Sequence, residues 1–293
     1  MCDERTENDN ENFEKNGGAL NRRDFSKLSA AAMLTMIAPA GAMGQEVVED
    51  STEMVDMPDG VSDCYYVRPT TGKHPAVLIW PDIRGLRNAF KVMGKRLAMQ
   101  GYAVLVVNPF YRDAKAPVVP EGSSFRDPDT RKLLIGMARK LTQDASMSDA
   151  RAYIGFLDAQ DSVDTSRKVG TMGYCMGGPL IMRTAGAVPE RVGAAASFHG
   201  GGIVTDREDS PHLLIPQSPA HVLHAIAEND DERGPEAKHV LAAAYKAAGI
   251  PAEIEVYEGT LHGWCPPDSS VYNEAQAERA WSRVSALFER ALA

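Results

Sequence analysis

This sequence has few cysteines, no long apolar run and no excess of basic residues. Its 293 residues include four cysteines, none in a C-x-x-C pair or spaced with histidine as metal ligands are, so neither a disulfide framework nor a metal site is expected. No apolar stretch reaches the roughly 18 residues that a membrane-spanning helix needs. Acidic residues outnumber basic ones by 40 to 31, and the net charge of −9 argues against nucleic acid or an anionic membrane as the main partner.

The rest of the composition is that of an ordinary globular protein. Hydrophobic residues make up 44% and charged residues 24% of the chain, which is enough for a substantial buried core. The length suits one large α/β domain or two smaller ones. Because neither an internal repeat nor a convincing interdomain linker is visible, we expect one domain over residues 63–293.

The first 44 residues differ from the rest. The paired arginines Arg22 and Arg23 precede a weakly apolar run, Leu28–Ala38, and then a stretch of small residues that ends at Gly44. This order resembles a bacterial twin-arginine export signal, so we expect residues 1–44 to engage the twin-arginine export machinery and the folded protein to work in the periplasm. The alternative is a disordered tail with a short amphipathic helix on a cytoplasmic protein.

Removal of such a signal would take Cys2 away and leave three cysteines. An odd count in an oxidising compartment indicates a free functional thiol. The acidic residues 45–62 are expected to form a flexible lead into the domain.

Apolar runs and helical patterns alternate along residues 63–293. Strands are expected at Cys64–Arg68, Ala76–Trp80, Ala103–Asn108, Lys168–Met172, Gly193–Phe198, Val222–Ala227 and Ala252–Tyr257, and helices at Asn88–Gln100, Thr130–Leu141, Ser148–Asp158, Gly177–Ala187, Glu236–Ala248 and Asn273–Leu292. The alternation predicts an α/β fold with a mostly parallel, doubly wound sheet and helices on both faces. Ligands bind such sheets at the carboxyl ends of the strands, so the chemistry is expected in the loops that follow them.

A cysteine occupies the centre of a hexapeptide in which hydrolases normally carry serine. Residues 173–178 read GYCMGG and follow an apolar run directly. The pattern G-x-S-x-G, here with cysteine for serine, is typical of the sharp strand-to-helix turn that lifts a nucleophile above the sheet of an α/β-hydrolase. Cys175 is therefore the candidate nucleophile, and an α/β-hydrolase fold is the expected architecture.

The other parts of a nucleophilic site also follow predicted strands, in the order nucleophile, acid, histidine. His262 is the candidate base, which would take the thiol proton and later activate water. Asp230 would accept from the other ring nitrogen and stabilise the imidazolium. Asp231 is the alternative acid, and either carboxylate could instead cap a helix.

Two backbone N–H groups are expected to form the oxyanion hole. One belongs to Met176, directly after the nucleophile, and the other to Ile83, in the loop after an early strand. Candidate pocket walls are Tyr111, His199 and Trp264, although aromatic residues near a sheet edge more often belong to the core and His199 could be a structural histidine.

Taken together, these segments resemble the dienelactone hydrolase family, whose members are cysteine-centred α/β-hydrolases. The resemblance covers most of residues 63–292 and rests on DIRG at 82–85, QGYAV at 100–104, GYCMGG at 173–178, FHGG at 198–201 and LHGW at 261–264. It implies an enol-lactone or ester hydrolase that needs no cofactor. It also implies that Asp82 contacts the resting thiol and helps to deprotonate it when substrate arrives.

Two positions depart from the family pattern. The usual glutamate of the family is the shorter Asp82 here, and Pro266 replaces an arginine that, in the family prototype, grips a substrate carboxylate. The candidates to replace that arginine are Arg84, Arg87, Arg112 and Arg126, unless these side chains are simply solvated.

The expected reaction is hydrolysis of activated carboxylic esters or lactones through a thioacyl intermediate on Cys175. A thiolate is a strong nucleophile, but it also leaves readily from a tetrahedral intermediate, so the leaving group of the substrate must compete with it. Enolates and phenolates can compete, whereas ordinary amines cannot without efficient protonation. The alternatives are a ligand-binding protein on a disabled hydrolase scaffold and a thiol-redox protein; a regulatory disulfide between Cys265 and Cys175 is a further variant.

Overall fold

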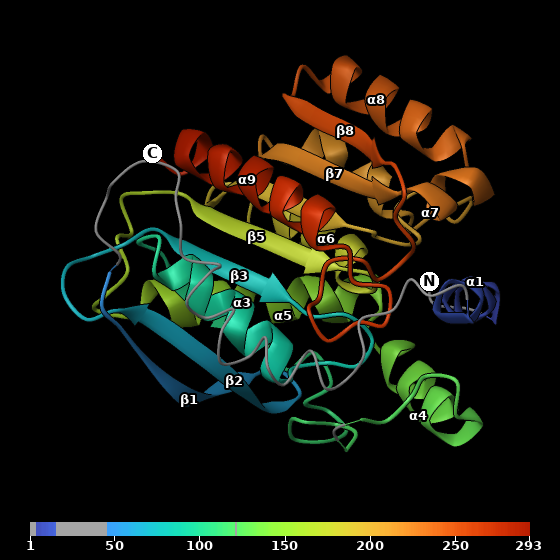
Figure 1. Ribbon diagram of the computed structural model, residues 1–293. Coiled ribbons are helices and arrows are strands. Elements are labelled where there is room, and N and C mark those ends of the chain that lie inside the picture. Colours follow the sequence, from blue (N-terminus) through green and yellow to red (C-terminus); the bar gives the residue numbers. More distant parts are fainter. Residues whose placement is uncertain (1–3, 16–45, 121) are drawn as a thin grey trace.

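A single mixed sheet organises the protein. The computed structural model describes residues 4–15, 46–120 and 122–293, and the strand order within them is β1-β2-β4-β3-β5-β6-β7-β8 (Figure 1). The parallel strands are β3 (Ala76–Trp80), β4 (Ala103–Val106), β5 (Val169–Tyr174), β6 (Val192–Phe198), β7 (His221–Ala227) and β8 (Ala252–Tyr257). The strands β1 (Val48–Met57) and β2 (Gly60–Pro69) join them antiparallel. The predicted mostly parallel α/β-hydrolase sheet is confirmed.

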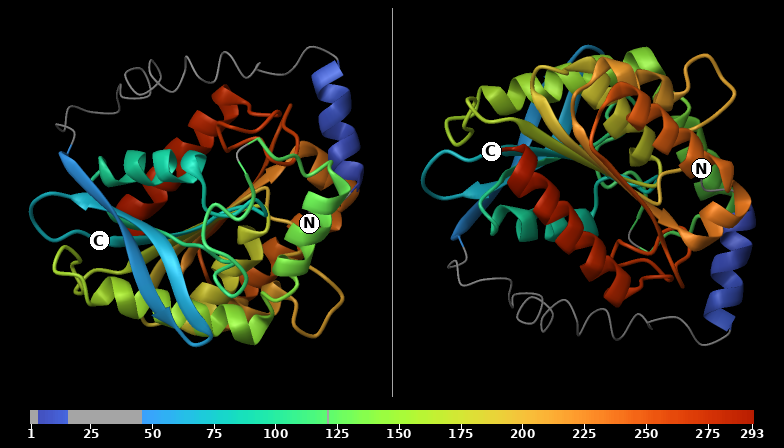
Figure 2. Two further views of the ribbon diagram at one scale, coloured as in Figure 1. Left: turned by 90° about the horizontal axis from the view of Figure 1, so that it is seen from below. Right: turned by 90° about the horizontal axis from the view of Figure 1, so that it is seen from above.

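Helices cover both faces of this sheet (Figure 2). On one face lie α3 (Asn88–Ala98) and α9 (Glu274–Ala291), and on the other lie α5 (Gln143–Asp158), α6 (Gly177–Ala187) and α8 (Glu236–Ala248). All five residues of β3 are buried and apolar, as a parallel strand with both faces covered requires.

The remaining elements are α1 (Glu4–Lys15), α4 (Pro128–Ala138), α7 (Glu228–Arg233) and the 3-10 helix η1 (Pro211–Gln217). None of the helices in the described ranges is long and apolar enough to cross a membrane. The predicted twin-arginine segment lies outside the described residues, apart from α1, and export stays a prediction.

The structure differs from our expectation at residues 48–57, which we assigned to a flexible lead. They form β1, which pairs along its length with β2. The pattern is weak in sequence because only Val55 and Met57 are buried, and most of the other side chains of β1, many of them acidic, are exposed. Pairing with the neighbouring strand, rather than burial of its own side chains, therefore places β1 in the sheet.

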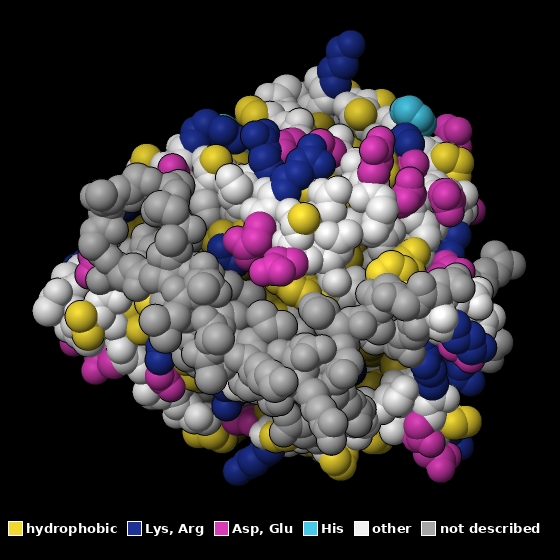
Figure 3. Space-filling view, in the orientation of Figure 1, with side chains coloured by type: hydrophobic (Ala, Val, Ile, Leu, Met, Phe, Trp, Pro, Cys, Tyr) yellow, Lys and Arg dark blue, Asp and Glu magenta, His cyan; other side chains and the backbone are white. Residues whose placement is uncertain are grey.

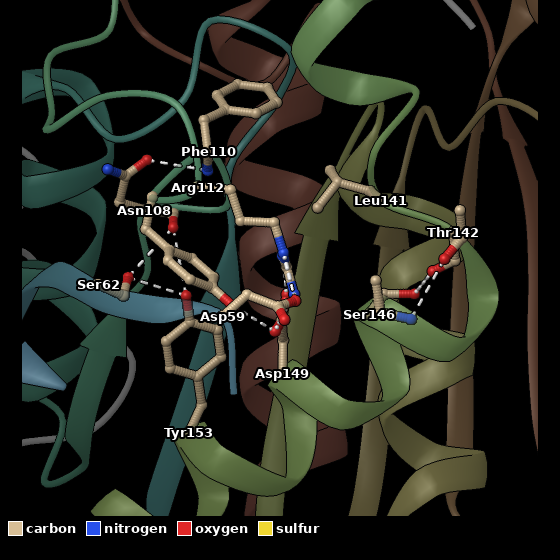
Figure 4. Close-up of polar contacts among 12 residues, drawn as sticks. Asp59, Ser62, Asn108, Phe110, Arg112, Leu141, Thr142, Ser146, Asp149 and Tyr153 are labelled. Carbon is tan, nitrogen blue, oxygen red and sulfur yellow. Dashed lines mark hydrogen bonds and ion pairs between the residues drawn. The ribbon is translucent and has the colours of Figure 1, made fainter. Parts of the chain in front are cut away.

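A buried carboxylate ties the long segment between β4 and α4 to helix α5 (Figure 4). Asp149 of α5 is fully buried and accepts hydrogen bonds from Nη1 and Nη2 of Arg112, both at 2.7 Å, and from the hydroxyl of Tyr111 at 2.8 Å. Arg112 also pairs with Asp59 at 2.7 Å. Arg112 and the phenol of Tyr111 are thus engaged in anchoring this segment.

We expect Asp149→Ala to lower the free energy of unfolding by about 3 kcal/mol, because removal of one partner strands a largely buried charge. Asp59→Ala is the matched control: the Asp59 side chain is 59% exposed, so its loss should cost at most about 1 kcal/mol. Urea unfolding of the two variants measures the difference. Equal losses would show that burial of Asp149 does not determine its contribution.

Candidate active site

The turn between β5 and α6 presents Cys175 in a strained backbone conformation. Its φ is 52°, a left-handed value that costs a non-glycine residue about 1–3 kcal/mol and is typical of functional sites. Its N–H donates to the carbonyl of Phe198 at 3.0 Å. A Cβ at Gly173 would lie 2.2 Å from the carbonyl oxygen of Gly177, so the turn closes only because glycine occupies that position.

Three predicted residues lie in one hydrogen-bonded chain above this turn. The Nε2 atom of His262, in the loop after β8, is 3.0 Å from Sγ of Cys175. The Nδ1 atom of the same ring is 2.7 Å from Oδ2 of Asp230, at the start of α7. Asp231 instead accepts from Nζ of Lys238 at 2.6 Å. The geometry therefore selects Asp230 over Asp231 as the partner of the histidine.

The pKa shifts of His262 and Asp230 favour the charged form of both residues. Burial alone would lower the pKa of His262, but the negative charges of Cys175 and Asp230 outweigh it and raise the pKa well above the ordinary value. Burial alone would raise the pKa of Asp230, but His262 outweighs it and lowers the pKa. An imidazolium paired with the Asp230 carboxylate is therefore the favoured state of His262.

The other two described cysteines, Cys64 and Cys265, are buried thiols with raised pKa values. Burial raises the pKa of Cys64 to about 12 and that of Cys265 well above its ordinary value. Both are free thiols, and a thiol that stays protonated is a poor nucleophile. The reactive position is therefore expected at Cys175.

Asn229 positions the main chain of His262, a role that the sequence did not reveal. Its Oδ1 accepts from the backbone N–H of His262 at 2.9 Å, and its Nδ2 donates to Asp9 of α1 at 2.9 Å. Asn229 is 5% exposed. No pattern marks this asparagine within its acidic run, because its partner lies far along the chain.

The two expected oxyanion donors lie in the elements predicted for them. Met176 precedes the first turn of α6, and Ile83 follows β3 and is buried. Neither N–H donates to a carbonyl within the described ranges. The oxyanion hole formed by these two N–H groups stays a prediction.

The Asp82 carboxylate is bound by arginine. Its two carboxylate oxygens accept from Nη1 and Nη2 of Arg87 at 2.7 and 2.9 Å, and the backbone N–H of Arg84 donates to it at 2.9 Å. Burial would raise its pKa, but both arginine charges outweigh it and lower the pKa. Thiol activation by Asp82 stays a prediction.

Asp268, in the loop beyond His262, completes this network. It accepts from Nε of Arg87 at 2.7 Å and from Nη2 at 2.9 Å, and it also pairs with the guanidinium of Arg84. Arg84 and Arg87 are thus bound to carboxylates of the protein rather than simply solvated. Sequence reasoning missed Asp268, because its partners lie almost two hundred residues earlier in the chain.

Comparison with known proteins decides the family. The sequence profile of the dienelactone hydrolase family matches residues 62–292. The chain belongs to this family.

Relatives of this dienelactone hydrolase family member match most of its length. It is 25% identical over 270 residues to a Salmonella typhi protein to which carboxymethylenebutenolidase activity is ascribed, covering 90% of this chain and 94% of that protein. A Saccharolobus solfataricus protein with the same ascribed activity is 24% identical, with 73% and 89% of the chains covered. A Klebsiella pneumoniae crystal structure assigned as a dienelactone hydrolase aligns with a TM-score of 0.72 at 21% identity and covers 84% of this chain and all of that one. The chain is therefore a hydrolase-family protein of the α/β-hydrolase fold.

Of the remaining predicted pocket residues, one lies beside His262 and another belongs to the hydrophobic core. His199 packs against His262 with ring centroids 5.1 Å apart. Trp264 is fully buried and stacks on Tyr257 at 4.8 Å, so it belongs mainly to the core. Arg126 donates to Glu7 of α1 at 3.2 Å.

A surface hollow between β8 and α9 is lined mainly by charged side chains. It measures about 450 Å³ and is lined by Glu253, Glu255, Arg279 and Arg283 of β8 and α9, which pair with one another. Basic and acidic side chains lie mixed over this upper part of the molecule (Figure 3). Within the described ranges, no cluster of three or more His, Cys, Asp or Glu side chains is placed to hold a metal ion.

Proposed function

We propose that this protein hydrolyses activated carboxylic esters or lactones through a thioacyl intermediate on Cys175. The observation that carries the proposal is the continuous chain from thiol to imidazole to carboxylate, with 3.0 Å between Sγ and Nε2 of His262 and 2.7 Å between Nδ1 and Oδ2 of Asp230. Family membership supports the same class of reaction.

Acylation begins when the Cys175 thiolate attacks the substrate carbonyl carbon and forms a C–S bond. The carbonyl oxygen becomes an oxyanion, which in this proposal accepts hydrogen bonds from the backbone N–H groups of Met176 and Ile83. His262 then donates its Nε2 proton to the leaving oxygen as the C–O bond breaks. From an ester, an alcohol, phenol or enol departs and the acyl group remains on sulfur. From a lactone, the freed hydroxyl or enol remains attached to that acyl group.

Deacylation uses the same groups in reverse. Water attacks the thioester carbonyl while Nε2 of His262, now unprotonated, takes a proton from it. The new tetrahedral intermediate breaks its C–S bond and releases a carboxylic acid and the thiolate. Asp230 accepts from Nδ1 throughout and stabilises the imidazolium each time it forms.

The test compares an ester with its amide. We expect p-nitrophenyl acetate to be turned over at least about 1,000-fold faster than p-nitroacetanilide, because an aniline leaves less readily than the thiolate, and each 1.4 kcal/mol of barrier corresponds to about tenfold in rate. Mass spectrometry of the quenched reaction should find one acetyl group on Cys175 and none at that site in Cys175→Ala. Equal ester and amide rates, or a wild-type protein without adduct or turnover, would contradict the proposal and favour a binding or redox role.

A further inference from the structure

His199 ends β6 in the same way that Cys175 ends β5. Tyr174 and Phe198 are neighbours in the parallel register, so the residues that follow them leave the sheet side by side. Cys175 has φ 52° and His199 has φ 41°, and these are the two non-glycine residues with positive φ in the described ranges. A bulky side chain in this conformation costs about 1–3 kcal/mol, which points to a role that the strain serves.

The surrounding backbone holds His199 in this conformation. Its N–H donates to the carbonyl of Ala225 at 2.8 Å. The next residue, Gly200, passes so close to the start of α6 that a Cβ on Gly178 would lie 2.5 Å from its Cα. His199 is thereby fixed between the nucleophile turn and the ring of His262.

The imidazole of His199 is buried without a protein partner. It is 1% exposed, and neither Nδ1 nor Nε2 makes a hydrogen bond to another described residue. A buried polar group left unsatisfied costs about 1–3 kcal/mol. By contrast, the similarly buried His224 bonds through Nε2 to the Tyr245 hydroxyl at 3.0 Å. Packing alone therefore does not account for a histidine at position 199.

We propose that a ring nitrogen of His199 holds the water that hydrolyses the thioacyl-Cys175 intermediate. The inference rests on the proposed function and assigns a residue to its second step. The rings of His199 and His262 lie edge to face, with centroids 5.1 Å apart. A water with two hydrogen bonds of about 2.8 Å has partners up to about 5 Å apart, a separation similar to that of the two ring centres, and in our proposal this water bridges the two rings.

The charge state of His199 suits this role. Burial, followed by the nearby charge of His262, lowers its pKa to about 4, although Cys175, Asp230 and Asp82 act in the opposite direction. A neutral imidazole keeps one nitrogen as an acceptor. The water then gives one hydrogen to His199 and the other to Nε2 of His262, which directs an oxygen lone pair to the thioester carbonyl.

The water oxygen forms a C–O bond to the acyl carbon, and its proton moves to Nε2 of His262. The C–S bond then breaks, with its electron pair returning to sulfur, and the carboxylic acid leaves. His199 gains and loses no proton; it orients the water and remains neutral.

The test separates acylation from deacylation with p-nitrophenyl acetate. His199→Phe keeps an aromatic ring but removes both nitrogens. We expect the acylation rate to stay within about threefold of wild type and the deacylation rate to fall about 10- to 100-fold, the size of effect that misplacing a reactant produces. Acetyl-Cys175 should accumulate in the mass spectrum, and hydroxylamine, which attacks thioesters without activation by a base, should restore release of the acetyl group.

Two further variants control for structural effects. His199→Asn retains an acceptor oxygen and tolerates a left-handed backbone, so its deacylation should fall less than that of His199→Ala; this pair carries the same comparison if His199→Phe is unstable. His224→Phe removes another buried neutral imidazole and should leave the ratio of the two rates unchanged.

The results distinguish failure of the His199 role from failure of the proposed function. Acylation and deacylation that fall together in the His199 variants, or a deacylation rate that does not change, would overturn the role of His199 while leaving the proposed function intact. A wild-type protein that never carries an acetyl group on Cys175 would overturn the proposed function itself, and this inference with it.

Discussion

Replacing Cys175 by alanine is expected to lower kcat/KM for p-nitrophenyl acetate by about 10,000-fold or more, since loss of a nucleophile abolishes the covalent route and leaves only binding and the oxyanion donors. Cys175→Ser should lose at least about 100-fold, because a hydroxyl is much less acidic than a thiol and is a weaker nucleophile in its neutral form. Initial rates over a range of substrate concentrations measure both effects.

Cys64→Ala is the control for this comparison. Cys64 is fully buried and burial raises its pKa to about 12, so it is expected to contribute packing rather than reactivity. Its replacement should leave kcat/KM within about threefold at a temperature where the variant is folded. An alanine variant at position 175 with near wild-type turnover would require a different nucleophile.

Asp230→Asn is expected to lower kcat/KM by about 1,000- to 10,000-fold, since an amide cannot stabilise the imidazolium and can hold the ring in the wrong tautomer. Asp231→Asn is the matched control, because the adjacent carboxylate pairs with Lys238 at 2.6 Å instead. It should change kcat/KM by no more than about threefold, because loss of a partly exposed ion pair has a small energetic effect. Equal losses in the two variants would contradict the assignment of Asp230.

The raised pKa of His262 predicts how the alkylation rate of Cys175 depends on pH in the wild type and in Asp230→Asn. A raised pKa means that the folded protein favours the imidazolium form of His262. The stability that this form contributes is fully present below the ordinary histidine pKa and is lost as pH rises through the raised pKa. Alkylation of Cys175 by iodoacetamide should therefore vary little from about pH 6 to 8 in the wild type. In Asp230→Asn the imidazolium loses one source of support, so the rate should rise with pH over this range. Subtraction of the Cys175→Ala background isolates the site.

Much of the sheet could be predicted because its strands carry their own signal. The strands Ala76–Trp80 and Ala252–Tyr257 and the helices Gly177–Ala187 and Glu236–Ala248 have the expected bounds, since apolar runs and helical spacing report burial directly. The strand β1 carries no comparable signal, as it buries only two of its side chains. The short helix α7 was expected as a loop, because its acidic sequence ENDDER has no apolar face.

The candidate site was predictable to the extent that it follows strand order. The glycine-rich turn marked Cys175, and the carboxyl ends of β7 and β8 pointed to Asp230 and His262, because parallel strands deliver their loops to one edge of the sheet. The choice between Asp230 and Asp231 was not available from order alone, since adjacent residues on a helix point in different directions.

Local pattern thus determined the fold class, the family and the residue types gathered at one edge of the sheet. Tertiary structure alone decided which of those residues touch: Arg87 pairs with both Asp82 and Asp268, Asn229 holds the main chain of His262, and His199 is buried beside the His262 ring. The reason is physical. Strand and helix signals arise from burial of neighbours in the chain, whereas hydrogen bonds and ion pairs in the site join segments far apart in sequence and depend on distances that only the folded chain sets.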